Sequence, residues 1–154
     1  MRAVLQRVTH ASVVANGVPT GAIGPGLMIL LGVEVADGPE VSMADVLWLA
    51  QKVAQMRIFS DEEGLMNRSV QDIDGNILVV SQFTLFAKTK KGNRPSFIDA
   101  ARPDVAVPYY EAFVRELENI LGRKVPTGVF GAEMQIDMQA DRPVTIIIDT
   151  RDRQ

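Results

Sequence analysis

The stretch Ile77-Leu-Val-Val-Ser-Gln-Phe-Thr-Leu-Phe-Ala-Lys88 decides how the rest of the chain is interpreted. It begins as an apolar run, which is typical of a strand inside a sheet, and it carries polar side chains from Ser81 onward. On one continuous strand, Gln82 and Thr84 would face one side and Ser81 the other. A strand with a hydroxyl, an amide and another hydroxyl so close together either satisfies a local hydrogen-bond network or lines a functional site.

Length and composition predict one compact domain over residues 1–154. The chain is 47% hydrophobic and 23% charged, so it can bury a real core. Its net charge of -3 indicates that any contact with nucleic acid is local rather than spread over the whole surface. The sequence has no Cys, which excludes disulfides, thiol catalysis and Cys-zinc sites, and its single His, His10, leaves a hydroxyl nucleophile one possible imidazole base. A metal site could then use only carboxylates and this one imidazole.

We expect neither a membrane span nor a signal peptide in this sequence. Apolar runs stay shorter than the ~18 residues that a membrane span needs. The stretch Met1-Arg-Ala-Val-Leu-Gln-Arg-Val8 has Arg and Gln inside its apolar run, unlike a signal peptide. We expect a cytoplasmic protein without membrane contact.

Periodicity and turn signals predict about seven strands and two helices. Alternating or continuous apolar runs place strands at residues 2–8, 12–15, 18–23, 27–33, 77–88, 133–139 and 144–149, and residues 57–59 are expected to be a short extended piece. Asn16-Gly17 and Asp74-Gly75 are hairpin signals. Residues 36–39 are expected to be a loop, and residues 61–64 and 140–143 turns.

Two amphipathic patterns predict the helices. Ser42 with Asp45 forms a weak capping box before an apolar stripe that ends near Met56. The second helix is expected to be capped by Asp104, to hold Pro108 in its first turn and to end at Gly122. Its expected buried stripe is Tyr110, Phe113, Val114, Leu117, Ile120 and Leu121. The fold class is therefore α/β (α+β), with a curved mixed sheet and both helices packed on one side.

The polar residues of the opening stretch have two interpretations. Gln82 and neighbouring backbone N–H groups could form an oxyanion hole, whereas Ser81 or Thr84 as a nucleophile would need a base that nothing in the sequence places nearby. The alternative is a structural strand whose polar groups bond to a neighbouring loop.

Two further segments could contact nucleic acid. Lys88, Lys90, Lys91 and Arg94 lie in one polar loop that could bind phosphates, although such loops are usually only solvated. Phe130 lies in a Gly-rich connector where it could stack on a base, although it could equally be a core side chain in a tight connection.

Several motifs together carry a family resemblance. Ser81-Gln-Phe-Thr-Leu85, Arg94-Pro-Ser-Phe97, Phe130-Gly-Ala-Glu-Met134, Pro143-Val-Thr145 and the first eight residues resemble the D-aminoacyl-tRNA deacylases. The resemblance covers essentially the whole chain, in order. It implies a homodimer without metal or cofactor that hydrolyses the ester between a D-amino acid, or a mischarged glycine, and the terminal adenosine of tRNA.

The resemblance also assigns roles. Ser81, Gln82, Phe83 and Thr84 would line the catalytic site, with Gln82 and the Phe83 backbone as oxyanion donors and Thr84 as a positioning group or, alternatively, a nucleophile. A further alternative is that the RNA itself supplies the critical catalytic group. The substrate-binding residues would be Arg142, Pro143, Val144, Thr145, Phe130 and Met134, and the RNA phosphate contacts would be Lys88, Lys90, Lys91 and Arg94.

The chain departs from the family at one motif. The family's Gly-Pro-Val-Thr has a cis Gly-Pro bond and enters the partner subunit's site, where its backbone screens chirality. Here Arg142 replaces the glycine. We expect the Arg142–Pro143 bond to be cis, because an X-Pro bond of any residue can adopt that form for about 0.5–1 kcal/mol.

Other classes of function remain open at this point. A non-catalytic tRNA-binding module would bind RNA without hydrolysis. A hydrolase of small D-amino-acid esters would be insensitive to charge removal in the basic loop. A dimeric structural partner would do neither.

Overall fold

The computed structural model describes residues 1–35 and 41–154. Its main sheet is built on β1 (Arg2–Ala15), a strand of 14 residues that is long enough to pair with three others. The strand β7 (Met134–Asp149) runs antiparallel along the full length of β1. On the opposite edge, β3 (Gly26–Gly32) pairs with the first half of β1 and β2 (Val18–Ile23) with the second half. The strand β6 (Asn76–Ser81) pairs with β3 in parallel and completes the five-stranded sheet.

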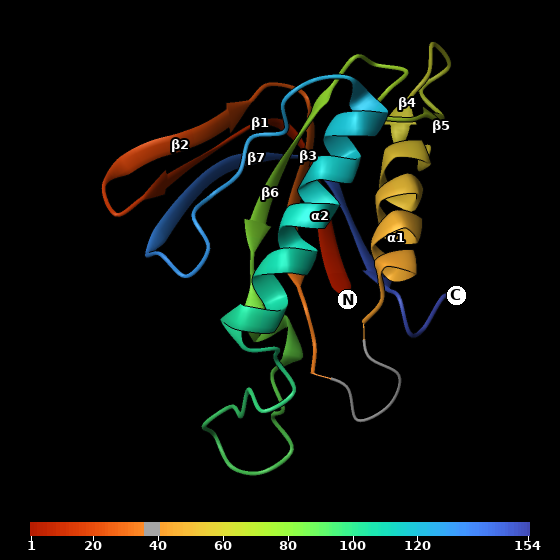
Figure 1. Ribbon diagram of the computed structural model, residues 1–154. Coiled ribbons are helices and arrows are strands. Elements are labelled where there is room, and N and C mark those ends of the chain that lie inside the picture. The colour runs from red at the N-terminus through yellow and green to blue at the C-terminus, as the bar shows by residue number, and fades with distance from the viewer. Residues whose placement is uncertain (36–40) are drawn as a thin grey trace.

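Two helices lie side by side on one face of this sheet, as predicted (Figure 1). They are α1 (Met43–Gln55) and α2 (Pro103–Leu121). The apolar stripe of α1 is buried against the sheet, and so are Tyr110, Phe113 and Leu117 of α2. Burial of this kind is the main favourable term in folding, so the sheet and the two helices form one core.

A second, smaller apolar cluster lies on the other face of the sheet, because it is formed by the alternate residues of the same strands. It consists of Val8, Ala11, Val13, Ile23, Met28, Leu78 and Val80. Met134 and Ile136 of β7 pack against it. The beginning of β7 therefore packs against this second cluster, which contains Val80 near the end of β6.

Local signals predicted several boundaries correctly. Ser42 and Asp45 form a complete capping box at the start of α1, and Gly122, with φ of 68°, ends α2 in the left-handed conformation. The hairpin at Asn16-Gly17 joins β1 to β2. The loop predicted for residues 36–39 lies outside the described residues.

Other predicted elements are wrong. Residues 2–8 and 12–15 are one strand, β1, and residues 134–139 and 144–149 belong to a single strand, β7, because each strand stays paired with the other across local irregularities. Asp74-Gly75 is a turn into β6, which pairs in parallel with β3 and makes no hairpin there. The preceding short strands, β4 (Phe59–Ser60) and β5 (Met66–Arg68), form their own small sheet.

The start of α2 also differs from the prediction. The N-cap is Arg102, which makes no side-chain capping bond, and Pro103 occupies the first turn. Asp104 therefore lies inside the helix, and Pro108 is in the interior rather than the first turn. A proline at the first helical position is favourable because its missing N–H would have no partner there.

Candidate active site

The apolar stretch that opened the sequence analysis changes structure at Ser81. The strand β6 ends there, and residues Phe83–Phe86 form a single 3-10 turn, η1. The Gln82 N–H still donates to the carbonyl of Leu31, at 2.8 Å, which is the last bond that follows the sheet. The predicted strand over residues 77–88 is therefore wrong beyond Ser81, and Phe83 and Thr84 do not alternate between two faces.

The close approach of η1 to β3 explains this change. A Cβ atom on Gly32 would lie 2.8 Å from the Phe86 ring and 3.0 Å from the carbonyl oxygen of Gln82. Because Gly32 has no side chain, Phe86 can be buried against β3 and the chain can fold back into a turn. The alternation of residues 81–86 gave no sign of this contact, since it depends on a residue 50 positions away.

A cavity of about 580 Å³ opens beside the junction of β6 and η1. Its lining comes from β3, β6, η1, the start of α2, the connector before β7 and the first residues of β7. Five of the predicted site residues contribute to the lining: Ser81, Gln82, Phe83, Phe130 and Met134. Residues separated by half the chain in sequence are thus brought to one site.

Aromatic rings form two walls of the cavity. Phe83, 56% exposed, meets Phe97 edge to face with ring centroids 5.1 Å apart. Phe130 meets Tyr110 in the same way at 5.8 Å. Such pairs favour this geometry and leave ring faces available for a planar group. Phe97 and Tyr110 were not predicted as site residues, although Phe97 closes one of the quoted motifs and Tyr110 was expected in the helical stripe.

Tyr110 is unsuited to proton transfer at neutral pH. Its hydroxyl donates to the carbonyl of Val79 at 3.1 Å, and burial raises the pKa of Tyr110 to about 12. Among the described residues that line the cavity there is no carboxylate, imidazole or amine. His10 lies elsewhere, 3.7 Å from Asp137 on the surface. The site therefore offers hydrogen-bond donors and apolar walls rather than a general base.

Gln82 and Thr84 interact directly. The Gln82 amide donates to the Thr84 hydroxyl, which is exposed and lies outside the cavity lining. The first N–H groups of a helical turn have no acceptor within it, so those of Phe83 and Thr84 are available as donors. This arrangement presents an amide, a hydroxyl and backbone donors at the cavity edge.

The predicted motif at residues 142–145 lies apart from this cavity. Residues 141–144 form a bulge in β7 opposite the single residue Arg7, so the turn predicted at residues 140–143 is wrong. The Arg142–Pro143 bond is trans, which corrects the predicted cis bond. Arg142 has a φ of 66°, which lies in the left-handed region, and this backbone conformation redirects the chain in place of a cis bond. The conformation favours glycine, so Arg at this position carries a backbone cost.

Arg7 holds the bulge from inside the sheet. Its guanidinium is 3% exposed and donates to the carbonyl of Ile58 at 2.6 Å, and its Nε lies 3.1 Å from Asp141 Oδ2 in an ion pair. Thr145 donates to the side chain of Gln6 at 2.8 Å. Arg142 and Pro143 remain exposed, and none of residues 142–145 lines the cavity of its own chain.

The basic loop lies at the same end of the molecule as η1 and the start of α2. Lys88 and Ser96 close it with two backbone bonds of 2.8 and 3.0 Å, and Lys88 Nζ lies 2.8 Å from Asp99. Lys90, Lys91 and Arg94 are exposed along it. Phe97 follows directly and enters the cavity lining, so the loop and the cavity are adjacent.

Metal clusters and membrane-spanning helices are both absent from the described part of the chain. Over residues 1–35 and 41–154, no cluster of three or more His, Asp or Glu side chains has the arrangement of a metal site. No helix in the same ranges is both long enough and apolar enough to span a membrane.

Fold and site together define a small α+β domain whose cavity combines a polar turn with aromatic walls. Comparison with known proteins identifies the class. The D-Tyr-tRNA(Tyr) deacylase family matches residues 4–149, and the chain belongs to this family. Proteins named D-aminoacyl-tRNA deacylase from Flavobacterium johnsoniae and Akkermansia muciniphila are 53% and 56% identical to it, over all of this chain and all of theirs.

Solved structures agree with the fold. One, named c-Myc DNA unwinding element binding protein, superposes with a TM-score of 0.86 at 38% identity over 97% of this chain and 98% of that one. Another, a probable eukaryotic D-amino acid tRNA deacylase, has a TM-score of 0.83 over 96% of this chain and 97% of that one. At 18% identity this second likeness concerns the fold alone.

Proposed function

We propose that this protein hydrolyses the ester bond of D-aminoacyl-tRNA, and of mischarged glycyl-tRNA, releasing the free amino acid and tRNA as a chiral proofreading step in translation. The observation that carries the proposal is identity of 53–56%, over full length, to proteins named for this activity. The cavity beside Ser81, Gln82 and Phe83 supplies a site of suitable size and chemistry. The proposed location is the cytoplasm.

The proposed mechanism stabilises an oxyanion instead of activating a protein nucleophile. An aminoacyl ester next to a ribose hydroxyl is already reactive, so positioning it beside fixed donors can supply most of the acceleration. Gln82 and the Phe83 backbone N–H are the proposed donors. Thr84, with its hydroxyl already accepting from Gln82, orients the substrate or a water molecule. The ribose hydroxyl of the terminal adenosine assists the reaction, without a metal or cofactor.

The remaining predicted residues hold the tRNA end. Phe130 and Met134 in the cavity offer a ring face and a flexible apolar side chain to the 3′-terminal adenosine or the aminoacyl group. Lys88, Lys90, Lys91 and Arg94 lie beside the opening and contact phosphates.

Residues Arg142, Pro143, Val144 and Thr145 complete the site from a second copy of the chain. Support comes from their position: Arg142 and Pro143 are exposed in the bulge, and none of the four residues lines the cavity of its own subunit. In a homodimer this bulge reaches the other subunit's cavity and excludes L-amino acids.

Hydrolysis of D-tyrosyl-, L-tyrosyl- and glycyl-tRNA, compared side by side with purified protein, tests the proposed activity. We expect rapid hydrolysis of the D-tyrosyl and glycyl esters and protection of the L-tyrosyl ester. Binding of tRNA with no hydrolysis would instead indicate a non-catalytic RNA-binding module. Equal hydrolysis of free D-tyrosine ethyl ester, with no effect of replacing Lys90, Lys91 and Arg94 by Ala, would indicate an enzyme for small esters.

The role of Thr84 is tested by Thr84→Ala. Because the proposed oxyanion donors remain, we expect this variant to keep substantial single-turnover hydrolysis and unchanged tRNA affinity. Loss of more than about a thousandfold in rate with tRNA binding intact would contradict positioning and favour a nucleophile. Thr84→Ser is the matched control, since it keeps the hydroxyl.

A further inference from the structure

Arg2, at the start of β1, contacts η1 from outside the cavity. Its Nη1 donates to the carbonyl of Leu85 at 2.6 Å, and its guanidinium carbon lies 4.8 Å from the centroid of the Phe86 ring. Carbonyl groups at the end of a helical turn have no N–H partner within that turn. Arg2 supplies the missing donor to the turn that carries Phe83 and Thr84.

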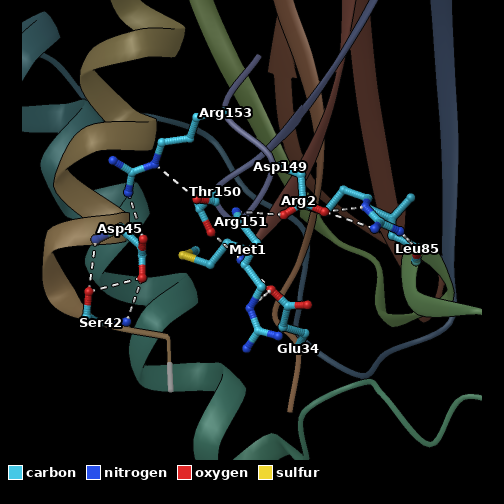
Figure 2. Close-up of polar contacts among 10 residues, drawn as sticks. All are labelled: Met1, Arg2, Glu34, Ser42, Asp45, Leu85, Asp149, Thr150, Arg151 and Arg153. Carbon is cyan, nitrogen blue, oxygen red and sulfur yellow. Dashed lines mark hydrogen bonds and ion pairs between the residues drawn. The ribbon is translucent and has the colours of Figure 1, made fainter. Parts of the chain in front are cut away.

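Asp149, at the end of β7, fixes the orientation of Arg2. Arg2 Nε and Nη2 donate to Asp149 Oδ2 at 3.0 and 2.9 Å, and the two residues are directly opposite in the β1–β7 ladder. The Asp149 side chain is 16% exposed, and its other oxygen accepts from the backbone of Arg151 at 3.0 Å. Figure 2 shows the guanidinium between Asp149 and Leu85. Charge-assisted bonds of this geometry hold a guanidinium plane firmly.

The turn η1 depends on such external contacts. It is a single turn of four residues, and at its two ends Leu85 N–H donates to the Gln82 carbonyl at 3.4 Å and Ala87 N–H to the Thr84 carbonyl at 3.1 Å. Short 3-10 turns have poor hydrogen-bond geometry and little stability of their own. Gly32 on β3 allows Phe86 to pack against one side of the turn, and Arg2 holds the Leu85 carbonyl on another.

We propose that Arg2, oriented by Asp149, is a positioning residue for the deacylation. It fixes η1 so that the Gln82 amide and the Phe83 N–H stay aligned at the cavity edge. The inference rests on the proposed function, because it concerns the geometry of the same site. Arg2 touches no substrate, and it acts through the backbone of Leu85 and the ring of Phe86.

The test compares Arg2→Met, which keeps an unbranched apolar stem over Phe86, with Arg2→Lys, which keeps the charge. Arg153→Met is the matched control. Arg153 makes an equivalent ion pair, 2.9 Å from Asp45, stacks on Trp48 at 4.2 Å and donates to the Thr150 carbonyl at 3.0 Å, and none of these contacts is to η1.

For Arg2→Met we expect a decrease of about 10- to 100-fold in single-turnover hydrolysis of D-tyrosyl-tRNA, because misplacement of about 1 Å costs this much. The Kd for tRNA should change less than twofold, since the basic loop is intact. Arg2→Lys should recover part of the rate, and Arg153→Met should keep it. Wild-type rate in Arg2→Met, or equal losses in Arg2→Met and Arg153→Met, would overturn the proposal.

Hydrogen exchange provides a readout that does not require activity. The amides of Leu85 and Ala87 should exchange faster in Arg2→Met than in the parent and in Arg153→Met. If Arg2→Met does not fold, Asp149→Asn removes the orienting charge but keeps an oxygen for Arg151, and it should have the same effect in smaller measure. Failure of the parent protein to hydrolyse D-tyrosyl-tRNA would refute the proposed function, whereas unchanged exchange in η1 would refute the positioning role.

Discussion

Gly32 shows how one absent side chain shapes the candidate site. The Phe86 ring and the Gln82 carbonyl occupy the space that a side chain at this position would need. The turn that presents Gln82 and Phe83 can therefore lie directly on β3. This contact could not be predicted from the sequence, because a glycine near the end of an apolar run indicates the end of a strand and not a contact surface.

We predict that Gly32→Ala displaces η1. The added Cβ would lie 2.8 Å from the ring of Phe86, a distance that requires the ring and the turn to move. Overpacking of this kind costs about 1–3 kcal/mol of unfolding free energy. Displacement of the oxyanion donors should lower single-turnover hydrolysis about 10- to 100-fold. Urea unfolding and single-turnover kinetics measure the two effects.

Gly24→Ala is the matched control for this change. Gly24 has nothing within 4 Å of a built Cβ, so its replacement should alter the unfolding free energy by less than about 0.5 kcal/mol. Equal behaviour of the two variants would show that the contact at Gly32 does not position the turn.

Among the elements, those fixed by local signals were predictable and those fixed by distant contacts were not. The helix α1 was predicted from Ser42, Asp45 and a regular apolar stripe, all within a few turns. The change from β6 to η1 depends on β3, and the bulge in β7 depends on Arg7 of β1. Alternation in a short window cannot distinguish a continuing strand from a turn that buries the same side chains.

The residues of the candidate site also divide into those that local sequence could predict and those that depend on distant contacts. Ser81 and Gln82 could be identified because polar groups after an apolar run are unusual, and Phe83 was identified from the family motif. Tyr110 and Phe97 were missed as walls of the cavity, since a helical stripe residue and a loop aromatic look like core or surface until the chain is folded. The separation of residues 142–145 from the cavity also needed the structure.

The capping box of α1 gives a pH-dependent prediction. Burial raises the pKa of Asp45, but the bonds from the Ser42 backbone and hydroxyl and from Arg153 outweigh it, so that the pKa is lowered below 3.8. A carboxyl group with a lower pKa in the folded state stabilises the fold above its unfolded pKa. That contribution is lost as the pH falls through the folded value.

Asp45→Asn should therefore reduce the unfolding free energy at pH 7 by about 0.3–1 kcal/mol, and the difference from the parent should shrink at about pH 3. Urea unfolding at both pH values measures this. Asp104→Asn is the control: Asp104 lies in the first turn of α2 but takes no part in a capping box. A difference for Asp45→Asn that stays constant down to about pH 2 would contradict the assigned role of its charge.

At the scale of the whole molecule, the two halves of the proposed site lie on different parts of the chain. The cavity is next to η1 and the basic loop, whereas the Arg142 bulge is elsewhere on β7. If the bulge serves the other subunit, the protein must be a dimer in solution. Sedimentation equilibrium tests this first, and a monomer at working concentration would contradict the proposal.

Mixed dimers then show which subunit the bulge serves. Gln82→Ala removes a proposed oxyanion donor and should inactivate the site of its own chain, while Pro143→Ala changes the bulge and should weaken rejection of L-substrates. Consider a dimer with Gln82→Ala on one chain and Pro143→Ala on the other. Its active site belongs to the second chain and receives the intact bulge of the first, so we expect L-tyrosyl-tRNA to be rejected. When both changes are on one chain and the other is unmodified, the active site receives the altered bulge, and L-tyrosyl-tRNA should be hydrolysed. The opposite pattern would place the bulge at the site of its own subunit, because only then does the chain that screens the substrate also hydrolyse it.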